Sequence, residues 1–378
     1  MCSSDLRALE TALDRYDPEG EALVVGGLFL DGVERIAGRR RFGVRSKAFG
    51  ALEDKAVIDE FWDACRVPRA PSETVPAHGA ALREASRRLD GGSGCVWAGD
   101  ASEGPNGGAA YVRWVRTPAD ARAAEAFFRA HCRRVRVMPF LEGIPCSIHG
   151  LVFPEGVAVL RPLEMITLRR PGQPEFAYAG GASFWDPAPW DRAEMRGVAR
   201  RVARALRDRG YRGGFSVDGV LSAEGFRPTE LNPRFSAGLN IFSACAPEIP
   251  LGWLAYAAQA GHALAYRPTD LEARVVEAVD RVRGGSGMAV VSKRFEATQR
   301  LGLVYEADRY RLAREDEDPD AALFAGPNES GGSVRFAPLP DRITRGPSFA
   351  PRVAAALACA DRALDLGLGA LEPARAAR

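Results

Sequence analysis

The hydrophobic positions of the chain repeat with two different periods, which predicts both helices and strands. In several stretches apolar residues recur roughly every three to four positions, as in helices that pack one face against a core. We expect helices at residues 5–16, 52–64, 80–89, 118–132, 192–209, 247–260 and 350–364. A proline opens the fourth of these stretches, and proline is favoured at the first position of a helix.

Other, shorter stretches alternate or are continuously apolar and end at Gly, Pro or polar turn residues, which is typical of β-strands. We expect strands at residues 21–29, 95–97, 110–115, 135–141, 147–153, 157–162, 164–168, 214–221, 225–231, 289–294 and 302–306. In the middle of the chain the strands follow one another with short turns, which favours an antiparallel sheet. The pattern therefore predicts a fold of the α+β or α/β class.

Breaks in the pattern indicate four units. The proline-broken stretch 67–76 predicts a linker, and the Gly-, Pro- and aromatic-rich stretch 171–190 predicts a flap over a substrate. The pattern changes again near residue 261. We therefore expect a small N-terminal α/β domain (1–70), two central subdomains (71–140 and 141–260) and a C-terminal lobe (261–378).

Composition narrows the class of protein. Of the 378 residues 26% are charged and the net charge is only +2, so nothing calls for nucleic acid or an anionic membrane as a partner. Seven cysteines without C-x-x-C spacing suggest neither a disulfide framework nor a zinc site. The sequence shows no signal peptide and no apolar run of about 18 residues, so a cytoplasmic location is expected.

Three oxygen-bearing side chains come together on the expected hairpin at 214–231. Asp218 lies on its first strand, whereas Glu230 and Asn232 lie two positions apart along the second and so face the same side. Two carboxylates and an amide on one face suit Mg²⁺ that bridges phosphates. The alternative is an exposed strand on which Glu230 pairs with Arg227 or Arg234.

The sequence motif of this hairpin resembles that of a known superfamily. Gly-Gly-Phe-Ser-Val-Asp-Gly at 213–219, followed by Glu-Leu-Asn-Pro-Arg at 230–234, is similar to the metal-binding hairpin of ATP-grasp proteins. The resemblance implies the ATP-grasp fold, with the nucleotide held between two α+β subdomains. It also implies that Asp218, Glu230 and Asn232 bind two Mg²⁺ ions, and that Asn232 and Arg234 act in catalysis, with Arg234 on the transferred phosphoryl group.

A second resemblance concerns the adenine site. Val-Met-Pro-Phe-Leu-Glu-Gly at 137–143 resembles the hinge segment that holds adenine in this superfamily. The residues that it assigns to the nucleotide are Pro139, Phe140, Leu141 and Glu142. Met138 and Pro145 stand where the superfamily often has Glu, so the ribose contact is unassigned. The alternative is an ordinary apolar strand that ends at a glycine turn.

The stretch 99–108 resembles the glycine-rich loop that closes over the phosphates, and it assigns Gly104, Gly107 and Gly108 to the nucleotide. The superfamily usually has a lysine on the preceding strand, where this chain has Trp97. Arg113 or Arg136 would then supply the charge. Lys55, in an Asp-Lys pair, matches the Asp-Lys that the superfamily often has at the helix before the nucleotide-binding subdomain, and the resemblance assigns it to the nucleotide. The alternative is a solvated helix lysine.

The acceptor side is less specific. Arg161 and Arg169 are candidates to hold a carboxylate or phosphate of the acceptor, because arginine forms paired hydrogen bonds to such groups. Ser236 and Gly238, in a small-residue loop at 235–240, are further substrate candidates. His149 is expected to be a hydrogen-bonded sheet residue rather than a base.

By this resemblance the protein is an ATP-dependent, ADP-forming ligase that joins a carboxylate to an amine. The alternatives are an ATP-binding protein of the same fold without ligase activity, and a carboxylase or phosphotransfer variant. The expected partners are ATP, Mg²⁺ and two small molecules, without nucleic acid or membrane, and a homodimer stays open.

Overall fold

The computed structural model describes residues 3–25, 34–43, 48–104, 107–329 and 331–377. The chain opens with helix α1 (Ser3–Tyr16) and a three-stranded sheet in the order β1 (Leu23–Val25), β3 (Arg39–Phe42) and β2 (Arg35–Ile36). Arg39 joins the two, because its guanidinium lies 2.7 Å from Asp14 and 3.0 Å from Asp17. The expected strand at 21–29 is seen as β1, and residues 26–29 lie outside the described part.

A four-stranded antiparallel sheet follows, in the order β4 (Glu73–Pro76), β7 (Arg134–Pro139), β5 (Cys95–Gly99) and β6 (Val112–Val115). Helices α3 (Gly79–Leu89) and α4 (Pro118–His131) pack on it around buried Trp97 and Phe128. The expected linker 67–76 is thus partly wrong, since it contains β4. The expected helix 52–64 is a 3-10 turn (Gly50–Glu53) followed by α2 (Ile58–Ala64).

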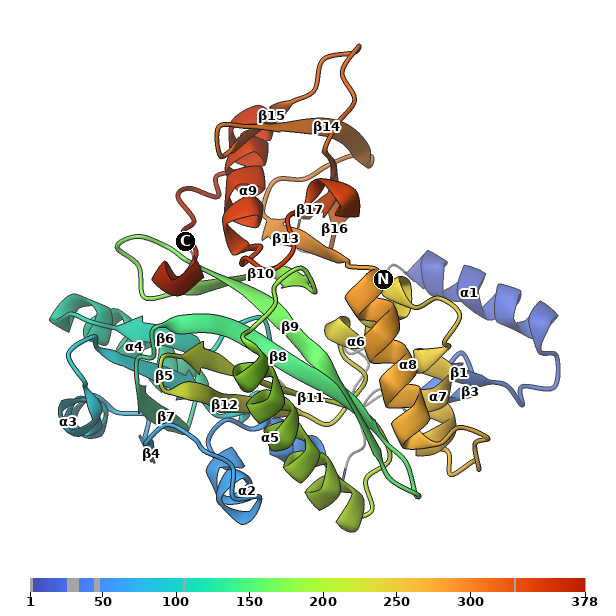
Figure 1. Cartoon of the computed structure of the whole chain (residues 1–378), viewed down its shortest axis with the longest axis horizontal. Coiled ribbons are helices and arrows are strands. Elements are labelled where there is room, and N and C mark those ends of the chain that lie inside the picture. The colour runs from blue at the N-terminus through green and yellow to red at the C-terminus, as the bar shows by residue number, and fades with distance from the viewer. Residues whose placement is uncertain (1–2, 26–33, 44–47, 105–106, 330, 378) are drawn as a thin grey trace.

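The largest sheet has ten strands in the order β12-β11-β8-β9-β10-β13-β17-β16-β14-β15 (Figure 1). All its pairings are antiparallel, as expected for the middle of the chain. Its strands are β8 (Gly143–Val152), β9 (Val157–Arg169), β10 (Phe176–Ala182), β11 (Gly213–Ser222), β12 (Gly225–Asn232), β13 (Gly285–Val291), β14 (Gln299–Glu306), β15 (Arg309–Leu312), β16 (Ala321–Asn328) and β17 (Gly331–Pro338).

Helices cover both faces of the first half of this sheet. Helix α5 (Pro189–Asp208) packs with α2 against side chains of β8 and β11 such as Ile148 and Val217. Side chains of α6 (Ala237–Cys245), α7 (Leu251–Gln259) and α8 (Pro268–Arg281) form a second core with β8 and β9. Within the described ranges, no helix has the length and apolar character needed to cross a membrane.

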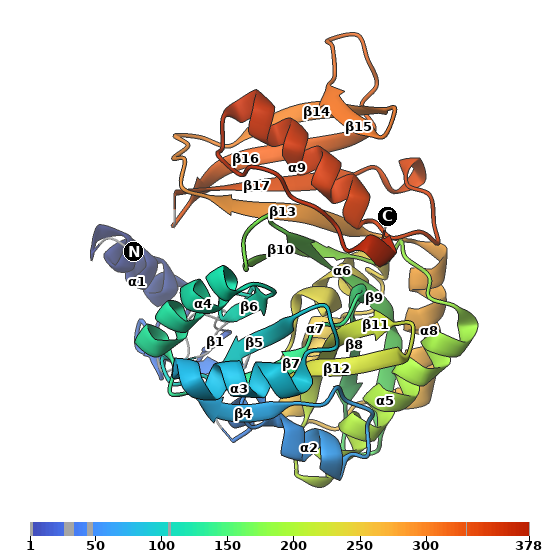
Figure 2. The same ribbon diagram turned by 90° about the vertical axis from the view of Figure 1, so that its left-hand side faces the viewer.

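The C-terminal strands continue the same sheet, because β13 pairs with β10 from Gly180 to Ala182 (Figure 2). Helix α9 (Ala350–Leu364) packs on them around Phe336 and Val353. Its N-terminus is fixed by buried Glu164 of β9, which accepts hydrogen bonds from the Phe349 and Ala350 amides at 2.6 and 3.3 Å. The expected C-terminal lobe is therefore built onto the central sheet.

Several expected elements differ for identifiable reasons. The strands expected at 157–162 and 164–168 are one strand, β9, in which Pro162 stands next to a shift in the pairing with β8. The expected flap 171–190 contains β10, in which Gly180 leaves room for the close approach of β13. The expected loop 235–240 leads into α6, and the sequence analysis did not foresee α8.

Candidate nucleotide and metal site

A cavity of about 950 Å³ lies between the four-stranded sheet and the ten-stranded sheet. Its walls come from β5 and β7 of the small sheet and from β8 to β12 of the large sheet, with α6 at one end and residues 138–141 among its lining. It therefore lies between the two central units that the sequence analysis expected to hold a ligand.

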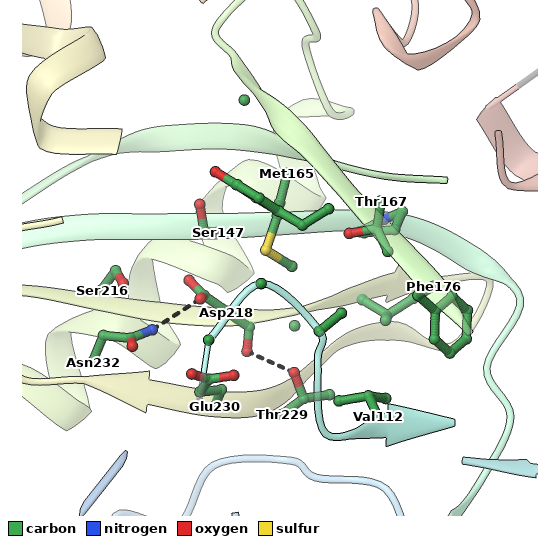
Figure 3. A pocket seen from close by; sticks show the side chains of 18 of the residues that line it. Val112, Ser147, Met165, Thr167, Phe176, Ser216, Asp218, Thr229, Glu230 and Asn232 are labelled. Atoms are coloured by element: carbon green, nitrogen blue, oxygen red, sulfur yellow. Dashed lines mark hydrogen bonds between the residues drawn. The ribbon is translucent and has the colours of Figure 1, made fainter. Parts of the chain in front are cut away.

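The carboxylate hairpin lines this cavity as expected. Asp218 of β11 stands opposite Glu230 of β12, and Asn232 donates a hydrogen bond from Nδ2 to Asp218 Oδ2 at 2.9 Å. Figure 3 shows the three side chains on neighbouring strands, with Ser147 and Met165 beyond Asp218. The pairing shifts after Asp218, and Thr229 donates from Oγ1 to the Asp218 carbonyl at 3.2 Å. Such a bulge changes the direction of the side chains beside it.

The electrostatics of the hairpin favour a bound cation. Burial and, second, the neighbouring Glu230 carboxylate raise the pKa of Asp218 to about 7, although Arg234 and Lys55 act in the opposite direction. A divalent cation would offset both unfavourable effects, and two carboxylates with an amide oxygen are the ligands that Mg²⁺ accepts. Among the described residues, no group of three or more His, Cys, Asp or Glu side chains could hold a metal.

Arg234 is held beside the hairpin by two contacts. Its Nη2 donates to Asn232 Oδ1 at 2.7 Å, and its Nε lies 3.2 Å from Glu53 Oε2. Glu53 comes from the 3-10 turn before α2, so the N-terminal part of the chain fixes this arginine. The guanidinium lines the cavity and can meet an anionic group next to the carboxylates.

Strand β5, where the superfamily usually has a phosphate-binding lysine, faces the cavity with other residues than expected. Trp97 is fully buried and donates from Nε1 to Ser86 at 2.8 Å, on the core side of β5. Its neighbours Val96 and Ala98 line the cavity instead. The expectation that Trp97 replaces a phosphate-binding lysine is therefore wrong, because alternate residues of a strand face opposite sides. The cavity-facing positions of β5 carry no charge.

Besides Arg234 and Arg169, two further cations line the cavity. Lys55 is 7% exposed, with Nζ 3.1 Å from Glu230 Oε2, so the alternative of a solvated helix lysine is wrong. Arg136 of β7 is also buried, 2.6 Å from Asp59, and donates to the Thr229 carbonyl at 3.2 Å. The other candidate, Arg113, is not part of the cavity lining.

The glycine-rich loop and the hinge are only partly in the cavity. Gly107 and Gly108 line it and Gly104 does not, while residues 105–106 lie outside the described part. At the hinge, the lining residues are Pro139, Phe140 and Leu141. Glu142 is instead bound by Arg169, with oxygen to nitrogen distances of 2.8 and 2.9 Å. Burial by itself would raise the Glu142 pKa, but the Arg169 hydrogen bonds outweigh it and lower the pKa.

The expected acceptor residues are divided between two places. Ser236 and Gly238 line the cavity at the start of α6, and Arg169 lines it near the hinge. Arg161 is fully buried outside the lining, 2.5 Å from Asp186 and 3.2 Å from Asp280. The structure thus places Arg161 in an internal ion cluster and does not bring it together with the other candidates.

His149 is a hydrogen-bonded sheet residue, as the sequence analysis expected. Its two ring nitrogens lie 2.8 Å from the Ser147 hydroxyl and 2.9 Å from the Ser236 hydroxyl. Burial lowers its pKa to about 3, and the Arg234 charge acts in the same direction, so the ring is neutral near pH 7. It fixes Ser236 at the end of the cavity.

The sequence analysis missed the lining residues of β9 and β10. These are Leu163, Met165, Thr167, Phe176, Tyr178, Gly180 and Gly181. Burial raises the pKa of Tyr178 to about 12, and the charge of Asp218 acts in the same direction. On β9, the alternation of Met165 and Thr167 could have predicted that both face the cavity. On β10, the residues were not predicted because 171–190 was interpreted as a flap.

No known family model matches the chain, and no curated protein matches its sequence. Solved structures do resemble it. Biotin carboxylase from Campylobacter jejuni has a TM-score of 0.55 and 14% identity, covering 98% of this chain and 80% of that one. Phosphoribosylamine–glycine ligase from Thermotoga maritima has a TM-score of 0.55 and 16% identity, covering 87% and 80%.

A third similar structure is the biotin carboxylase domain of 2-oxoglutarate carboxylase from Hydrogenobacter thermophilus, in complex with MgADP, ADP and bicarbonate. Its TM-score is 0.54 and its identity 12%, covering 89% of this chain and 74% of that one. These neighbours have the ATP-grasp fold, and their likeness shows that the present chain has it too. The fold expected from the hairpin is thereby confirmed.

Proposed function

We propose that the protein binds ATP with Mg²⁺ in the cavity and uses it to activate a carboxylate, which is then joined to an amine. The observation that carries this proposal is the convergence of Asp218, Glu230 and Asn232 beside Arg234 and Lys55 in one cavity. The fold supports it, since the solved neighbours include ligases and carboxylases, one of them in complex with MgADP.

In the proposed arrangement the hinge residues Pro139 to Leu141 take the base, and the triphosphate points towards the hairpin. Two Mg²⁺ ions, held by Asp218, Glu230 and Asn232, would neutralise phosphate charge. Lys55 and Arg136 are the buried cations next to the phosphates. Since β5 offers only Val96 and Ala98 there, these two cations take over the role of a strand lysine.

The proposed chemistry converts the substrate carboxylate, a poor electrophile, into an acylphosphate that an amine can attack. A carboxylate oxygen of the substrate attacks the γ-phosphorus, the bond to the ADP oxygen breaks, and an acylphosphate forms. The amine then attacks the acyl carbon, phosphate leaves and the nitrogen loses a proton. Arg234 would stabilise the negative charge of the transferred phosphoryl group, because Glu53 and Asn232 hold its guanidinium in place.

At the acceptor end we assign Ser236 and Gly238 to the substrate, with Tyr178 as a further candidate because it lines the same cavity. Arg161 has no part in this proposal, since the half-buried Asp186 and Asp280 already neutralise it. Arg169 is assigned to the nucleoside end, where its guanidinium lies 5.0 Å from the Phe140 ring centre.

The test is a coupled assay for ADP and phosphate with a panel of carboxylates and amines, tried singly and in pairs. The proposal predicts ADP release that depends on Mg²⁺ and on both co-substrates, with a stable amide as the product. Its matched variant is Arg234→Lys, which keeps the charge but loses the paired geometry. We expect this change to lower kcat by at least about tenfold with little effect on ATP binding.

A second candidate function is nucleotide binding without ligation. The observation that favours it is the apolar phosphate side of β5, where Val96 and Ala98 line the cavity. This candidate predicts that Mg²⁺ and ATP raise the Tm while every carboxylate and amine pair leaves ADP release at the background rate. Turnover with any pair decides for the ligase. A carboxylase variant would instead show ADP release that depends on bicarbonate.

A further inference from the structure

The segment that follows α9 returns across the sheet to the hinge of the cavity (Figure 1). We call residues 371–377 the strap. Before it, Leu366 and Leu368 are buried in the same core as α9, and Arg170 donates to the Leu368 carbonyl at 2.7 Å. Leu371 packs against that core as well, so the strap starts from a fixed point of the C-terminal lobe.

The strap binds the hinge through its backbone. Arg169 and Glu372 form two mutual backbone hydrogen bonds, of 2.7 and 2.9 Å, as in a short antiparallel ladder. The amide of Arg375 donates to Glu142 Oε1 at 2.9 Å, at the start of the final 3-10 turn. Ala374, between these anchors, is 2% exposed and is itself part of the cavity lining.

These contacts fix the side chain of Arg169 as well as its backbone. Glu142 binds both terminal nitrogens of the guanidinium, which lies 5.0 Å from the Phe140 ring centre and 5.2 Å from that of Trp114. Phe140 and Trp114 are stacked, with ring centres 4.0 Å apart. The strap, the ion pair and the two rings therefore form one rigid group at the hinge end of the cavity.

We propose that the strap is part of the nucleotide site: Ala374 closes the wall beside the base, and the bonds from Glu372 and Arg375 hold Arg169 and Glu142 in the position that binds the nucleoside. This inference rests on the proposed function, because it needs a nucleotide at the hinge. It adds that the C-terminal lobe contributes to affinity for the nucleoside but not for the phosphates. Glu142 acts through Arg169 and is a positioning residue.

The experiment measures by calorimetry, in the presence of Mg²⁺, how tightly the wild type and each variant bind two ligands. The first is ADP, which reaches the hinge, and the second is tripolyphosphate, which has no nucleoside. Ala374→Leu puts a larger side chain into the buried wall, and Glu142→Gln keeps the size of the side chain but removes its charge. The control is Ala358→Leu at an exposed position of α9. Melting curves verify that each variant is folded.

We expect Ala374→Leu and Glu142→Gln to weaken ADP binding by about tenfold while tripolyphosphate binding stays within about twofold of wild type. Ala358→Leu should leave both affinities unchanged. A general loss of structure would weaken both ligands equally, and that result would overturn the role of the strap. Unchanged ADP binding in both variants would overturn it too, with the nucleotide site intact. If the wild type binds neither ligand, the proposed function itself fails. If Ala374→Leu does not fold, Glu142→Gln decides alone.

Discussion

Asn232 connects the two parts of the candidate site at the scale of single residues. Its amide nitrogen donates to Asp218 and its amide oxygen accepts from Arg234, so one side chain orients both the carboxylate and the cation. Neither contact is available to a leucine or alanine at this position. The geometry of the hairpin therefore depends on Asn232, which we also propose as an oxygen ligand of Mg²⁺.

His149 gives a prediction about pH. Its pKa is lowered to about 3 by burial and by Arg234, whereas an unfolded histidine has a pKa of about 6.5. Between these values the unfolded chain binds more protons, so stability is lost as the pH falls from about 6.5 towards 3. We expect His149→Gln to lose less stability over this range than the wild type, measured by urea unfolding at several pH values. In NMR spectra, the His149 ring signal of the wild type is identified as the one that this variant lacks. It should not shift between about pH 7.5 and 5, and a shift there would contradict the lowered pKa of His149.

Gly238 gives a prediction about packing. A Cβ atom at this position would lie 2.1 Å from His149 Nε2, which is far inside contact distance. Gly238→Ala should therefore lower the free energy of unfolding by about 1–3 kcal/mol and displace the start of α6. The control is Gly252→Ala in α7, where the new Cβ would meet Phe235 at 3.8 Å, an ordinary contact. If both variants melt alike, the close packing of Gly238 on His149 is refuted.

At the scale of elements, buried ion pairs join β9 to α8 and the loop after β10. Arg161 lies between Asp186 and Asp280, and Arg283 is 3.1 Å from Asp186. Removing one partner from a buried cluster leaves an uncompensated charge. The cluster therefore holds helix α8 on the sheet and stands apart from the cavity.

Arg161→Met tests this structural role. We expect it to lower the free energy of unfolding by about 1–3 kcal/mol, because Asp186 and Asp280 lose one cation but keep their contacts with Arg283 and, for Asp280, Arg192. In the fraction that stays folded, the KM values of all substrates should match those of the wild type. Arg201→Met, an exposed position of α5, is the control and should change neither quantity. A raised KM with unchanged stability would contradict the structural role and indicate that Arg161 binds substrate.

The elements differ in how far the sequence could predict them. The hairpin was predictable, because a period of two fixes which of Asp218, Glu230 and Asn232 share a face. Helix α6 was not, since its Gly238 is disfavoured in helices and is explained only by the approach of His149 from a distant strand. For the same reason β10 looked like a loop: a Cβ on Gly180 would collide with the Ser286 carbonyl of β13.

At the scale of the whole molecule, the ten-stranded sheet joins the candidate site to the C-terminal lobe. Pairing of β10 with β13 and of Arg169 with Glu372 cannot be inferred from local pattern, because the partners are about one hundred or more residues apart in sequence. The sequence predicted a lobe there, but not that its last residues reach the hinge. The cytoplasmic location and the homodimer stay predictions.

The most direct test of the account is calorimetric binding of ADP with and without Mg²⁺ to the wild type, Asp218→Asn and Glu230→Gln. Glu224→Gln, at the exposed turn of the same hairpin, is the matched control. The account predicts that Mg²⁺ strengthens ADP binding to the wild type and the control. In each carboxylate variant the factor by which Mg²⁺ increases ADP affinity should be at least about tenfold smaller, without a lower Tm. Equal Mg²⁺-dependent affinity in all four proteins would contradict it.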